Sequence, residues 1–407
     1  MTEPARAEVV VAGGGLVGGT LALALGRAGL DVAVVDAGAA PDPRWSAVSP
    51  GAFDAWARLG LEGLPAGAQP VTAMVVTEGP RPGAAAAPWA LPAALQFDAA
   101  EAGGDGPLAW MVENGAVRAA LDRALADAGV RVLAPARVAA VAFNGRGALV
   151  TLADGRELAA PLAVGAEGRR SAVREAAGIA VAVRPYPQSG LAATVRLSRP
   201  HRGAARQLFL PDGPLAVLPL PDDRASLVWT TGRAEAEALA ALPAAAFEAL
   251  LDRRLGDAVG PARLEGPRRV FPLERRLAER LAAPRAALVG DAAHAIHPVA
   301  GQGLNLGLKD AAALAEVVVD ARRQGEDWGA EAVLERYARW RRFDRTALAA
   351  GADLFARGFS TAAPWTRALR GAATAAVGRG ERLRRAFMAE AAGEAGDRPR
   401  LLRGEAL

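Results

Sequence analysis

The chain lacks cysteine altogether and has little aromatic residue content. Its 407 residues include no Cys, 5% Phe, Trp and Tyr, 52% hydrophobic and 23% charged residues. The absence of cysteine excludes a disulfide framework, a thiolate zinc site, iron–sulfur ligation and a cysteine nucleophile, and it fits a reducing compartment. The hydrophobic fraction excludes intrinsic disorder. The length predicts two domains or one large composite domain with a sizeable core.

Lysine is nearly absent as well. Lys309 is the only lysine among 48 basic residues, so arginine carries the basic charge and raises the pI to about 10.3 at a net charge of +4. Abundant Arg, Ala, Gly and Pro are typical of a GC-rich coding bias. Residues 346–407 hold 10 Arg against 6 acidic residues, and the rest of the chain is neutral. A basic tail on a neutral body indicates an anionic surface partner, and no nucleic acid partner is predicted.

No segment is predicted to cross a membrane or to direct export. Residues 9–26 carry no charge, but Gly13, Gly14, Gly15, Gly18 and Gly19 interrupt them. The first six residues have no basic n-region, so we expect a cytoplasmic protein, with peripheral contact to the inner face of the membrane left open. No metal is predicted, because His294 and His297 have no third ligand at suitable spacing.

A glycine motif opens the chain. Residues 8–12 predict a strand, residues 16–28 a helix and residues 31–36 a second strand, with G-x-G-x-x-G at the first turn. Such a turn lets a pyrophosphate approach the helix N-terminus, and an acid at the end of the second strand binds ribose. This motif alone does not separate FAD from NAD. The predicted cofactor-binding residues are Gly13, Gly15, Leu16, Val17, Gly18 and Asp36.

Two further glycine-rich turns follow predicted strands. The first, at residues 164–174, contains Glu167-Gly168 and a basic helix start, and an ordinary β-turn-α connection is the alternative. In the second, at residues 288–305, Asp291 can accept a hydrogen bond from a polyol chain. The turn at 301–304 opens a helix whose N–H groups would favour the anionic edge of a reduced flavin. His294 is an alternative catalytic base, although packing beside the cofactor explains it more simply.

The three motifs, in this order, resemble those of flavoprotein aromatic monooxygenases of the para-hydroxybenzoate hydroxylase type. Finer stretches resemble one branch, the ubiquinone-biosynthesis hydroxylases, over residues 8–345. Residues 42–49 are similar to its D-x-R-x-x-A-L-S, residues 112–114 to its V-E-N, and residues 209–220 to its F-L-P-x-G-P-L-A-L-L-P-L. There are departures: Glu167 replaces the usual Asp, Asp36 the commoner Glu, and Gly115 the usual Arg or His, which turns attention to Arg118 for a phosphate contact.

The resemblance implies an α/β fold: a Rossmann-like FAD-binding domain with an inserted antiparallel β-sheet substrate domain and a helical C-terminus. The expected FAD-binding parts are residues 1–75, 100–182 and 270–345. The expected substrate domain is residues 76–99 and 183–269, and residues 346–407 form the helical C-terminal region. The resemblance adds the following cofactor-binding residues: Arg44, Asn114, Arg118, Gly290, Asp291, Pro298, Gly301, Gln302, Gly303, Leu304 and Asn305.

The resemblance also implies an activity. NAD(P)H, a transient reductant, would reduce FAD, and the reduced flavin would activate O2 to hydroxylate a polyprenylated phenol in ubiquinone biosynthesis. Two alternatives remain open: a hydroxylase of a small soluble aromatic, and a non-catalytic FAD-bearing subunit of a biosynthetic complex. The sequence has no W-x-W-x-I-P stretch, which disfavours a flavin halogenase. The resemblance also implies that the turn containing Glu167-Gly168 touches both FAD and the nicotinamide nucleotide.

The tail combines apolar and basic residues. One interpretation is a helical cap on the cofactor domain, and the other is a basic amphipathic surface that rests on an anionic membrane and admits a lipid-like substrate. Partners in a biosynthetic complex are a further expectation. The residues concerned are Leu354, Phe355, Phe359, Trp365, Leu369 and Phe387, interleaved with Arg357, Arg367, Arg370, Arg379, Arg382, Arg384 and Arg385.

Overall fold

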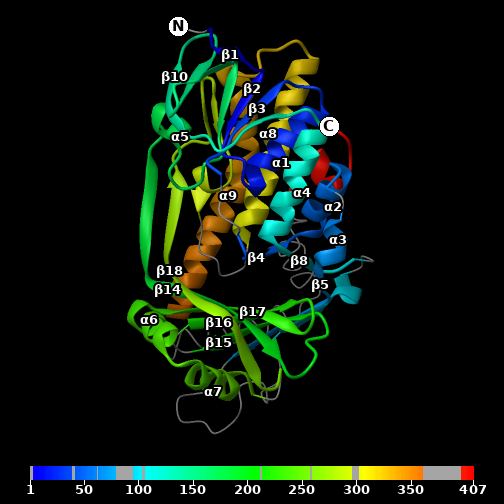
Figure 1. Cartoon of the computed structure of the whole chain (residues 1–407), viewed down its shortest axis with the longest axis vertical. Helices are drawn as coiled ribbons and strands as arrows, with labels where there is room; N and C mark the ends of the chain where they lie inside the picture. Colours follow the sequence, from blue (N-terminus) through cyan, green and yellow to red (C-terminus); the bar gives the residue numbers. More distant parts are fainter. Residues whose placement is uncertain are drawn as a thin grey trace.

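The computed structural model describes most of the chain, in two stacked parts joined by long strands (Figure 1). Of the helical residues 346–360 it describes the backbone alone. Among the described residues the strands form four sheets. The described residues are 3–38, 42–61, 63–78, 95–102, 106–210, 213–256, 259–295, 302–360 and 396–407.

The upper part is built on a six-stranded sheet of order β19-β20-β13-β2-β3-β9. Every pair is parallel except β19 with β20. The central strands are short apolar runs with every residue buried, as expected for a parallel sheet covered on both faces. The strands are β2 (Val9–Ala12), β3 (Val32–Val35), β9 (Arg131–Leu133), β13 (Leu162–Gly165), β19 (Ala282–Ala283) and β20 (Ala286–Leu288).

Helices cover this sheet. The helix α1 packs against α4 and α8, and its buried leucines join one large core with the strands. This is the predicted Rossmann-like arrangement, in which helices follow the strands that they cover. The bounds are α1 (Leu16–Arg27), α4 (Asn114–Asp127), α5 (Ala172–Ala176), α8 (Gln302–Arg323) and α9 (Glu331–Ser360).

A four-stranded sheet stands beside the parallel sheet. Apolar runs at 138–143 and 148–152 predict a hairpin. The structure forms it with these bounds as β10–β11, which pairs onward with β12 and β1. The strands are β1 (Ala5–Arg6), β10 (Val138–Phe143), β11 (Ala148–Leu152) and β12 (Glu157–Ala160).

The lower part is an eight-stranded, mainly antiparallel sheet of order β21-β18-β14-β17-β16-β15-β6-β7. One face packs its alternate apolar residues under α6 (Arg233–Ala241) and α7 (Ala244–Leu255). The turn between β16 and β17 has Asp222 and Asp223 at φ 62° and 53°. The strands are β6 (Ala73–Glu78), β7 (Leu95–Asp98), β14 (Val181–Leu197), β15 (Ala204–Leu210), β16 (Gly213–Leu220), β17 (Arg224–Gly232), β18 (Ala262–Ala278) and β21 (His294–Ala295).

The 17-residue strands β14 and β18 pair along much of their length and run from the upper part into the lower. The expected domain limits at 182/183 and 269/270 fall inside them. The sequence predicts a strand at 191–197, which is only the second part of β14, and residues 181–190 were not predicted as strand. Two register shifts between β14 and β18 mark where the ribbon bends.

A three-stranded sheet fills the space between the two parts. It consists of β4 (Trp45–Val48), β8 (Ala109–Glu113) and β5 (Gln69–Val71), next to α2 (Pro50–Arg58), α3 (Leu64–Gly67) and the short η2 (Ala99–Ala102). Val71 and Met111 of this sheet share a small core with Ala205 and Leu220 of the eight-stranded sheet. The face of the large sheet opposite α6 and α7 therefore turns toward β4, β5 and β8.

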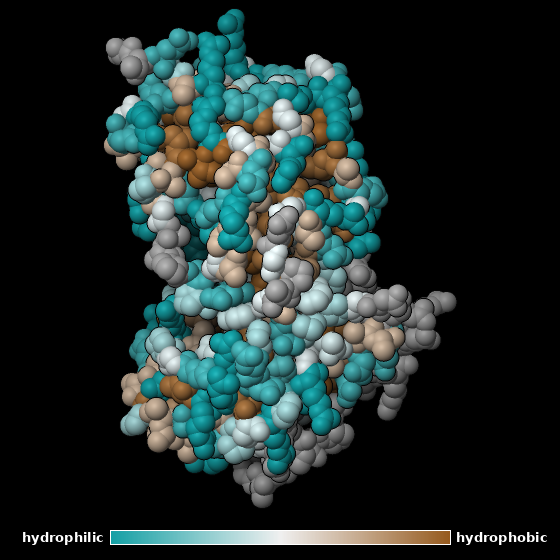
Figure 2. Space-filling view, turned by 45° about the vertical axis from the view of Figure 1, so that its right-hand side comes forward, coloured by the Kyte–Doolittle hydropathy of each residue, from teal (hydrophilic) through white to brown (hydrophobic). Residues whose placement is uncertain are grey.

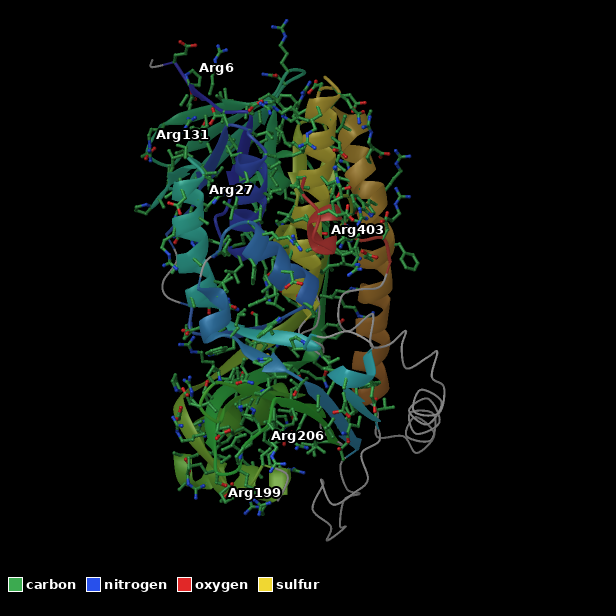
Figure 3. The ribbon with its side chains drawn as sticks, turned by 90° about the vertical axis from the view of Figure 1, so that its right-hand side faces the viewer. Arg6, Arg27, Arg131, Arg199, Arg206 and Arg403 are labelled. Atoms are coloured by element: carbon green, nitrogen blue, oxygen red, sulfur yellow. The ribbon has the colours of Figure 1, made fainter. Side chains whose placement is uncertain are left out.

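The last described residues return to the upper part. Residues 400–403 form η6 (Arg400–Arg403), which packs on α2 and α8 and buries Leu401 and Leu402. Arg400 pairs with Asp320 at 2.5 Å and Glu316 at 3.1 Å. Figure 3 shows η6, with Arg403, against the helices. Of the predicted apolar and basic tail residues, 361–395 and the side chains of 346–360 lie outside the described part.

Charge and hydrophobicity are distributed unevenly. Figure 3 places labelled arginines at both ends of the molecule, with Arg6 and Arg131 at one end and Arg199 at the other. On the face shown in Figure 2, hydrophobic residues gather over the upper part, and hydrophilic residues cover most of the lower part. None of the described helices is both long and apolar enough to span a membrane.

Candidate functional site

The glycine turn lies at the carboxyl end of β2. Gly13 has φ 98°, and a Cβ there would overlap the carbonyl of Ala166, while a Cβ on Gly18 would overlap the carbonyl of Gly13. These two glycines are required by close backbone packing. Gly15 differs, because its φ is −61° and no described atom lies within 4 Å of an ideal Cβ. Space is therefore open beside Gly15.

That space borders the N-terminus of α1. The helix begins at Leu16 and Val17 with no side-chain cap and no acidic residue in its first turn. Its first N–H groups and the positive end of its dipole therefore suit an anion. Side-chain room at Gly15 and uncapped N–H groups together fit the pyrophosphate of a dinucleotide cofactor.

Asp36, at the end of β3, is 5% exposed and anchors this turn. Its carboxylate accepts hydrogen bonds from Gly14 N at 2.8 Å, Gly38 N at 2.7 Å and Arg118 Nη1 at 3.1 Å. Arg118 also donates to Asp122 at 2.8 Å. Burial would lower the pKa of Arg118, but Asp122 and Asp36 raise it above its ordinary value. Arg118 is thus held by two carboxylates at the place where a phosphate contact was predicted.

Arg44 and Asn114 meet at Asp42. Arg44 donates Nε and Nη2 to the Asp42 carboxylate at 2.8 and 2.7 Å, and Asn114 donates Nδ2 at 3.0 Å. Ser46 closes the cluster by donating to Asn114 Oδ1 at 2.7 Å. Burial alone would raise the pKa of Asp42, but these hydrogen bonds lower it to about 2. Hydrogen bonding to Asp42 raises the pKa of Arg44, and the charge of nearby Asp291 adds to this.

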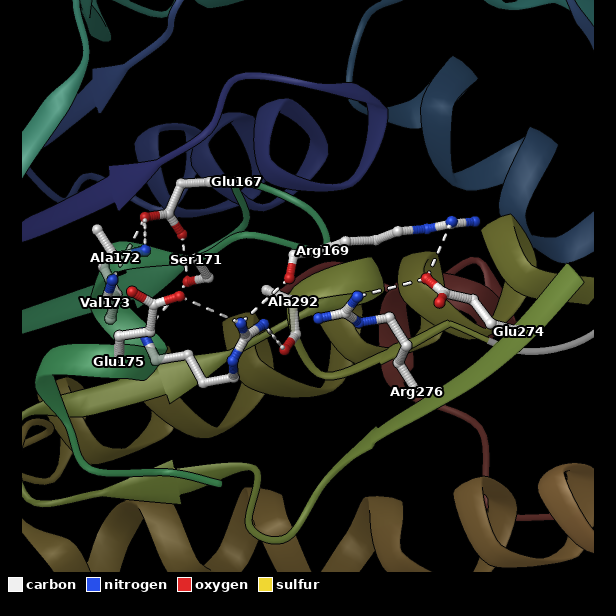
Figure 4. A network of polar contacts seen from close by, with 10 residues as sticks. Glu167, Arg169, Ser171, Ala172, Val173, Glu175, Glu274, Arg276 and Ala292 are labelled. Atoms are coloured by element: carbon white, nitrogen blue, oxygen red, sulfur yellow. Dashed lines mark hydrogen bonds and ion pairs between the residues drawn. The ribbon is translucent and has the colours of Figure 1, made fainter. Parts of the chain in front are cut away.

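In the second motif, Glu167 turns inward (Figure 4). It accepts hydrogen bonds from Ser171 Oγ at 2.5 Å, Ala172 N at 3.0 Å and Val173 N at 3.3 Å, and so caps the start of α5. Burial raises the pKa of Glu167 despite these bonds. Ser171 is the N-cap residue of α5 and accepts a hydrogen bond from Arg174 N at 3.2 Å, and the additional contacts of Glu167 were not foreseen.

Arg169, next in this turn, reaches across the site instead (Figure 4). Its guanidinium lies 3.2 Å from Glu274 of β18 and 4.0 Å from Asp291 of the third motif. Arg276 also contacts Glu274, at 3.3 Å. Arg169 was not among the predicted site residues, and it joins the second motif, the third motif and the long strand.

The third motif follows β20. Gly290 has φ 60°, and Asp291, in η4 (Gly290–Ala292), has a side chain that is 53% exposed. Its neighbour Ala292 accepts a hydrogen bond from the buried Arg174 at 3.2 Å. His294 is fully enclosed and contacts Asp310 at 2.5 Å. This burial fits a packing role for His294 and gives no support to its role as a base.

The first turn of α8 holds the remaining described candidates. Asn305 accepts from Ser49 N at 2.9 Å and donates to Ala47 O at 3.0 Å, so it ties α8 to the junction of β4 and α2. Gly303 and Leu304 precede it in α8. His297, Pro298, Gly301 and the side chain of Gln302 lie outside the described residues.

The three motifs meet at one edge of the parallel sheet. Gly13 and Gly18 pack against Ala166, while Val17 lies against Gly290 and against Gly307 of α8. Because β2, β13 and β20 are parallel neighbours, their carboxyl ends lie at one edge of the sheet, which is the edge where ligands bind in open α/β sheets.

Comparison with known proteins agrees with this geometry. The family model described as "FAD binding domain" matches residues 6–350, so the chain belongs to this family. The ubiquinone hydroxylase UbiL of Rhodospirillum rubrum is 42% identical over 410 residues, covering 98% of this chain and 93% of the relative. The 3-demethoxyubiquinol 3-hydroxylase of Escherichia coli is 36% identical over 397 residues, covering 95% and 98%.

Solved structures share the fold. PqsL of Pseudomonas aeruginosa in complex with 2-aminobenzoylacetate superposes with a TM-score of 0.73 at 26% identity, covering 87% of this chain and 97% of that one. The p-nitrophenol 4-monooxygenase PnpA of Pseudomonas putida gives 0.79 at 21% identity over 97% and 100%, a likeness of fold alone. The chain is thus a flavoprotein monooxygenase, and the predicted family, fold class and FAD cofactor are confirmed.

Asp291→Ala is expected to weaken FAD binding while the protein stays folded. The half-exposed carboxylate follows β20 at this edge of the sheet, and one charge-assisted hydrogen bond contributes about 1.5–3 kcal/mol, which corresponds to a roughly ten- to hundredfold loss of affinity. Fluorescence titration of the apoprotein with FAD measures this. Asp154→Ala, in an exposed turn, is the control. Equal dissociation constants for Asp291→Ala and wild type would remove Asp291 from the site.

Proposed function

We propose that this protein hydroxylates the aromatic ring of a polyprenylated phenol in ubiquinone biosynthesis, with FAD, NAD(P)H and O2. The similarity along nearly the whole chain to a ubiquinone hydroxylase and a 3-demethoxyubiquinol 3-hydroxylase carries the proposal. In this proposal, the six-stranded sheet with its helices binds FAD and the eight-stranded sheet covers the substrate. This assignment resembles the division into two domains expected from sequence.

The face of the eight-stranded sheet that turns toward β4, β5 and β8 supports an apolar substrate. On it, Ala192, Val228, Ala216 and Gln207 occupy one register row across β14, β17, β16 and β15. None of these four side chains is charged, and Arg269 of β18 continues the row beside Ala192. Small apolar side chains suit a ring with a hydrocarbon substituent.

When bound, FAD supplies electron transfer from NAD(P)H and activation of O2. The chain supplies the surroundings: α1 faces the pyrophosphate, Asp291 accepts from the polyol chain, and the sheets exclude water from the ring. Arg44 and Arg169 lie near Asp291 with side chains 73% and 47% exposed, so both guanidiniums are available to the phosphates of the reductant.

Profiling of quinone intermediates in a deletion strain tests the proposal. We expect one prenylated phenol to accumulate and to disappear on complementation, and the purified protein to oxidise NAD(P)H in its presence. Turnover of a short phenol with none of the prenylated one would support the small-aromatic alternative. Complementation by a variant unable to bind FAD would overturn the catalytic function.

We also propose peripheral membrane contact near α9. Phe343 is 76% exposed there, and its neighbour Arg342 and the residue one turn back, Arg339, are exposed too. An aromatic ring among arginines suits an anionic lipid surface, where each arginine contributes about 1 kcal/mol. This pattern continues the basic tail noted in the sequence.

In liposome flotation, wild type is expected to bind vesicles with anionic lipid and to release them at high salt. Phe343→Ser should lower the bound fraction several-fold, because burial of a phenylalanine contributes about 1.5–3 kcal/mol. Val183→Ser, which removes another exposed apolar side chain on β14, is the control. Equal flotation with neutral and anionic lipid, or an unchanged Phe343→Ser variant, would rule out this contact.

A further inference from the structure

A buried polar network connects the third motif to α8 and α9. Asp310 of α8 receives a hydrogen bond from Gly290 N at 3.3 Å, contacts His294 Nε2 at 2.5 Å and pairs with Arg341 Nε of α9 at 2.8 Å. The side chains of His294 and Arg341 are 0% exposed, and that of Asp310 is 1% exposed. No step of the proposed function uses these groups.

A second pair extends the network. Arg341 also donates to Asp344, which lies 2.6 Å from Lys309 Nζ. This lysine stands alone in a chain with 48 basic residues, and its side chain is 11% exposed. The ammonium is compact, whereas the guanidinium is a broad planar fork. The ammonium of Lys309 is enclosed beside Asp344, so we expect a guanidinium to fit this position less well.

Removing such charged groups from water costs free energy, and they are buried in folded proteins only when each is paired. Burial alone would raise the pKa of Asp310, but His294 and Arg341 more than offset it and hold the pKa below its ordinary value. Asp310 is therefore a carboxylate, and its two oxygens serve different partners. Oδ2 contacts Gly290 and His294, while Oδ1 contacts Arg341.

The contacts bracket Asp291. Gly290 comes directly before Asp291, and His294 follows three residues after it. Earlier in the chain, Leu288 O accepts a hydrogen bond from Tyr337 of α9 at 2.7 Å. The backbone on either side of Asp291 is thus fixed by α8 and α9. The side chain of Asp291 itself remains half exposed.

We propose that Asp310 and Arg341 are positioning residues that hold the loop of Asp291 in the geometry that binds FAD. The inference rests on the proposed role of Asp291 in the FAD site. It makes α9, which contributes none of the predicted cofactor-binding residues, a determinant of FAD affinity.

Titration of apoprotein variants with FAD tests this. Asp310→Asn and Arg341→Met are each expected to raise the dissociation constant at least tenfold, and to alter the visible circular dichroism of the bound flavin. In the double variant, the loss of FAD-binding free energy should be smaller than the sum of the losses in the two single variants, because neither charge is then left without its partner. Arg336→Met, on α9, removes the half-exposed pair with Glu326 in the α8–α9 connection and should stay within twofold of wild type.

Conservative variants separate positioning from folding. Arg341→Lys keeps a cation beside Asp310 and should recover part of the affinity that Arg341→Met loses, even if both lower the melting temperature of the apoprotein equally. An affinity that follows the melting temperature, with no recovery in Arg341→Lys, would overturn the proposal. Lys309→Arg should weaken FAD binding more than Arg336→Met does.

Asp291→Ala in the same titration distinguishes two kinds of failure. If Asp291→Ala weakens FAD binding and the folded Asp310→Asn and Arg341→Met variants do not, the positioning role is wrong and the FAD site stands. If Asp291→Ala also binds FAD as wild type does, the placement of the cofactor is wrong, and the network has no loop to position.

Discussion

Gly15→Val protein is expected to fold and to purify without FAD. The backbone of Gly15, at φ −61° and ψ −174°, is extended and open to any residue, and no described atom would touch an added Cβ. A branched side chain would instead occupy the space before the uncapped N–H groups of α1, which the pyrophosphate requires. We expect FAD affinity to fall more than a hundredfold at near wild-type stability. Flavin absorbance and apoprotein melting measure the two effects.

Gly13→Ala is the matched comparison. Gly13 adopts φ 98°, and its Cβ would overlap the carbonyl of Ala166, so this variant should destabilise the apoprotein itself. The two glycines of one motif thus serve different purposes, one for the ligand and one for the fold. A Gly15→Val protein that retains full FAD would contradict the assignment of this loop.

The strand–turn–helix unit at the N-terminus could be predicted from sequence because its determinants are local. Apolar residues at 9–12 and 32–35 leave little alternative to buried strands, and glycine spacing fixes the turn. The meeting of the three motifs follows from topology, since carboxyl ends of parallel strands share one edge. The apolar runs, the glycine spacing and the sheet topology all point to the same arrangement, which is why it could be predicted.

Side-chain partners could not be predicted in the same way. Arg118, predicted to contact a phosphate, lies on Asp36 and Asp122, and Glu167 of the second motif caps α5. In both cases the sequence shows that a charged side chain lies near the site, but the tertiary neighbours decide which way that side chain points. Arg169 was missed for the same reason, because its partners Glu274 and Asp291 are more than 100 residues away along the chain.

Long strands and the returning terminus were missed for a different reason. The first half of β14 contains Pro185, Pro187 and Gly190, which weaken any strand pattern, yet pairing with β18 holds it extended. Residues 400–403 were expected in the helical C-terminal region and form the short helix η6, but its position against α2 and α8 was not predicted. In β14, pairing with β18 outweighs the local preference of the residues.

Asp36→Asn is expected to destabilise the apoprotein by about 2–4 kcal/mol. The carboxylate accepts from Gly14 N, Gly38 N and Arg118, and an amide would turn an NH2 group toward one of these donors. Leaving a buried donor unpaired costs about 1–3 kcal/mol, and more where a charge is involved. Because Gly14 lies within the glycine turn, FAD affinity should fall as well.

Asp122→Asn provides the control for this change. Asp122 pairs with the same Arg118 at 2.8 Å, but its side chain is 49% exposed, so its loss should cost no more than about 0.5 kcal/mol. Urea unfolding of both apoproteins, followed by FAD titration, separates the two variants. If Asp36→Asn unfolds at the same urea concentration as Asp122→Asn, then Asp36 does not hold the turn. In that case the order of the glycine loop must come from Gly13 and Ala166 alone.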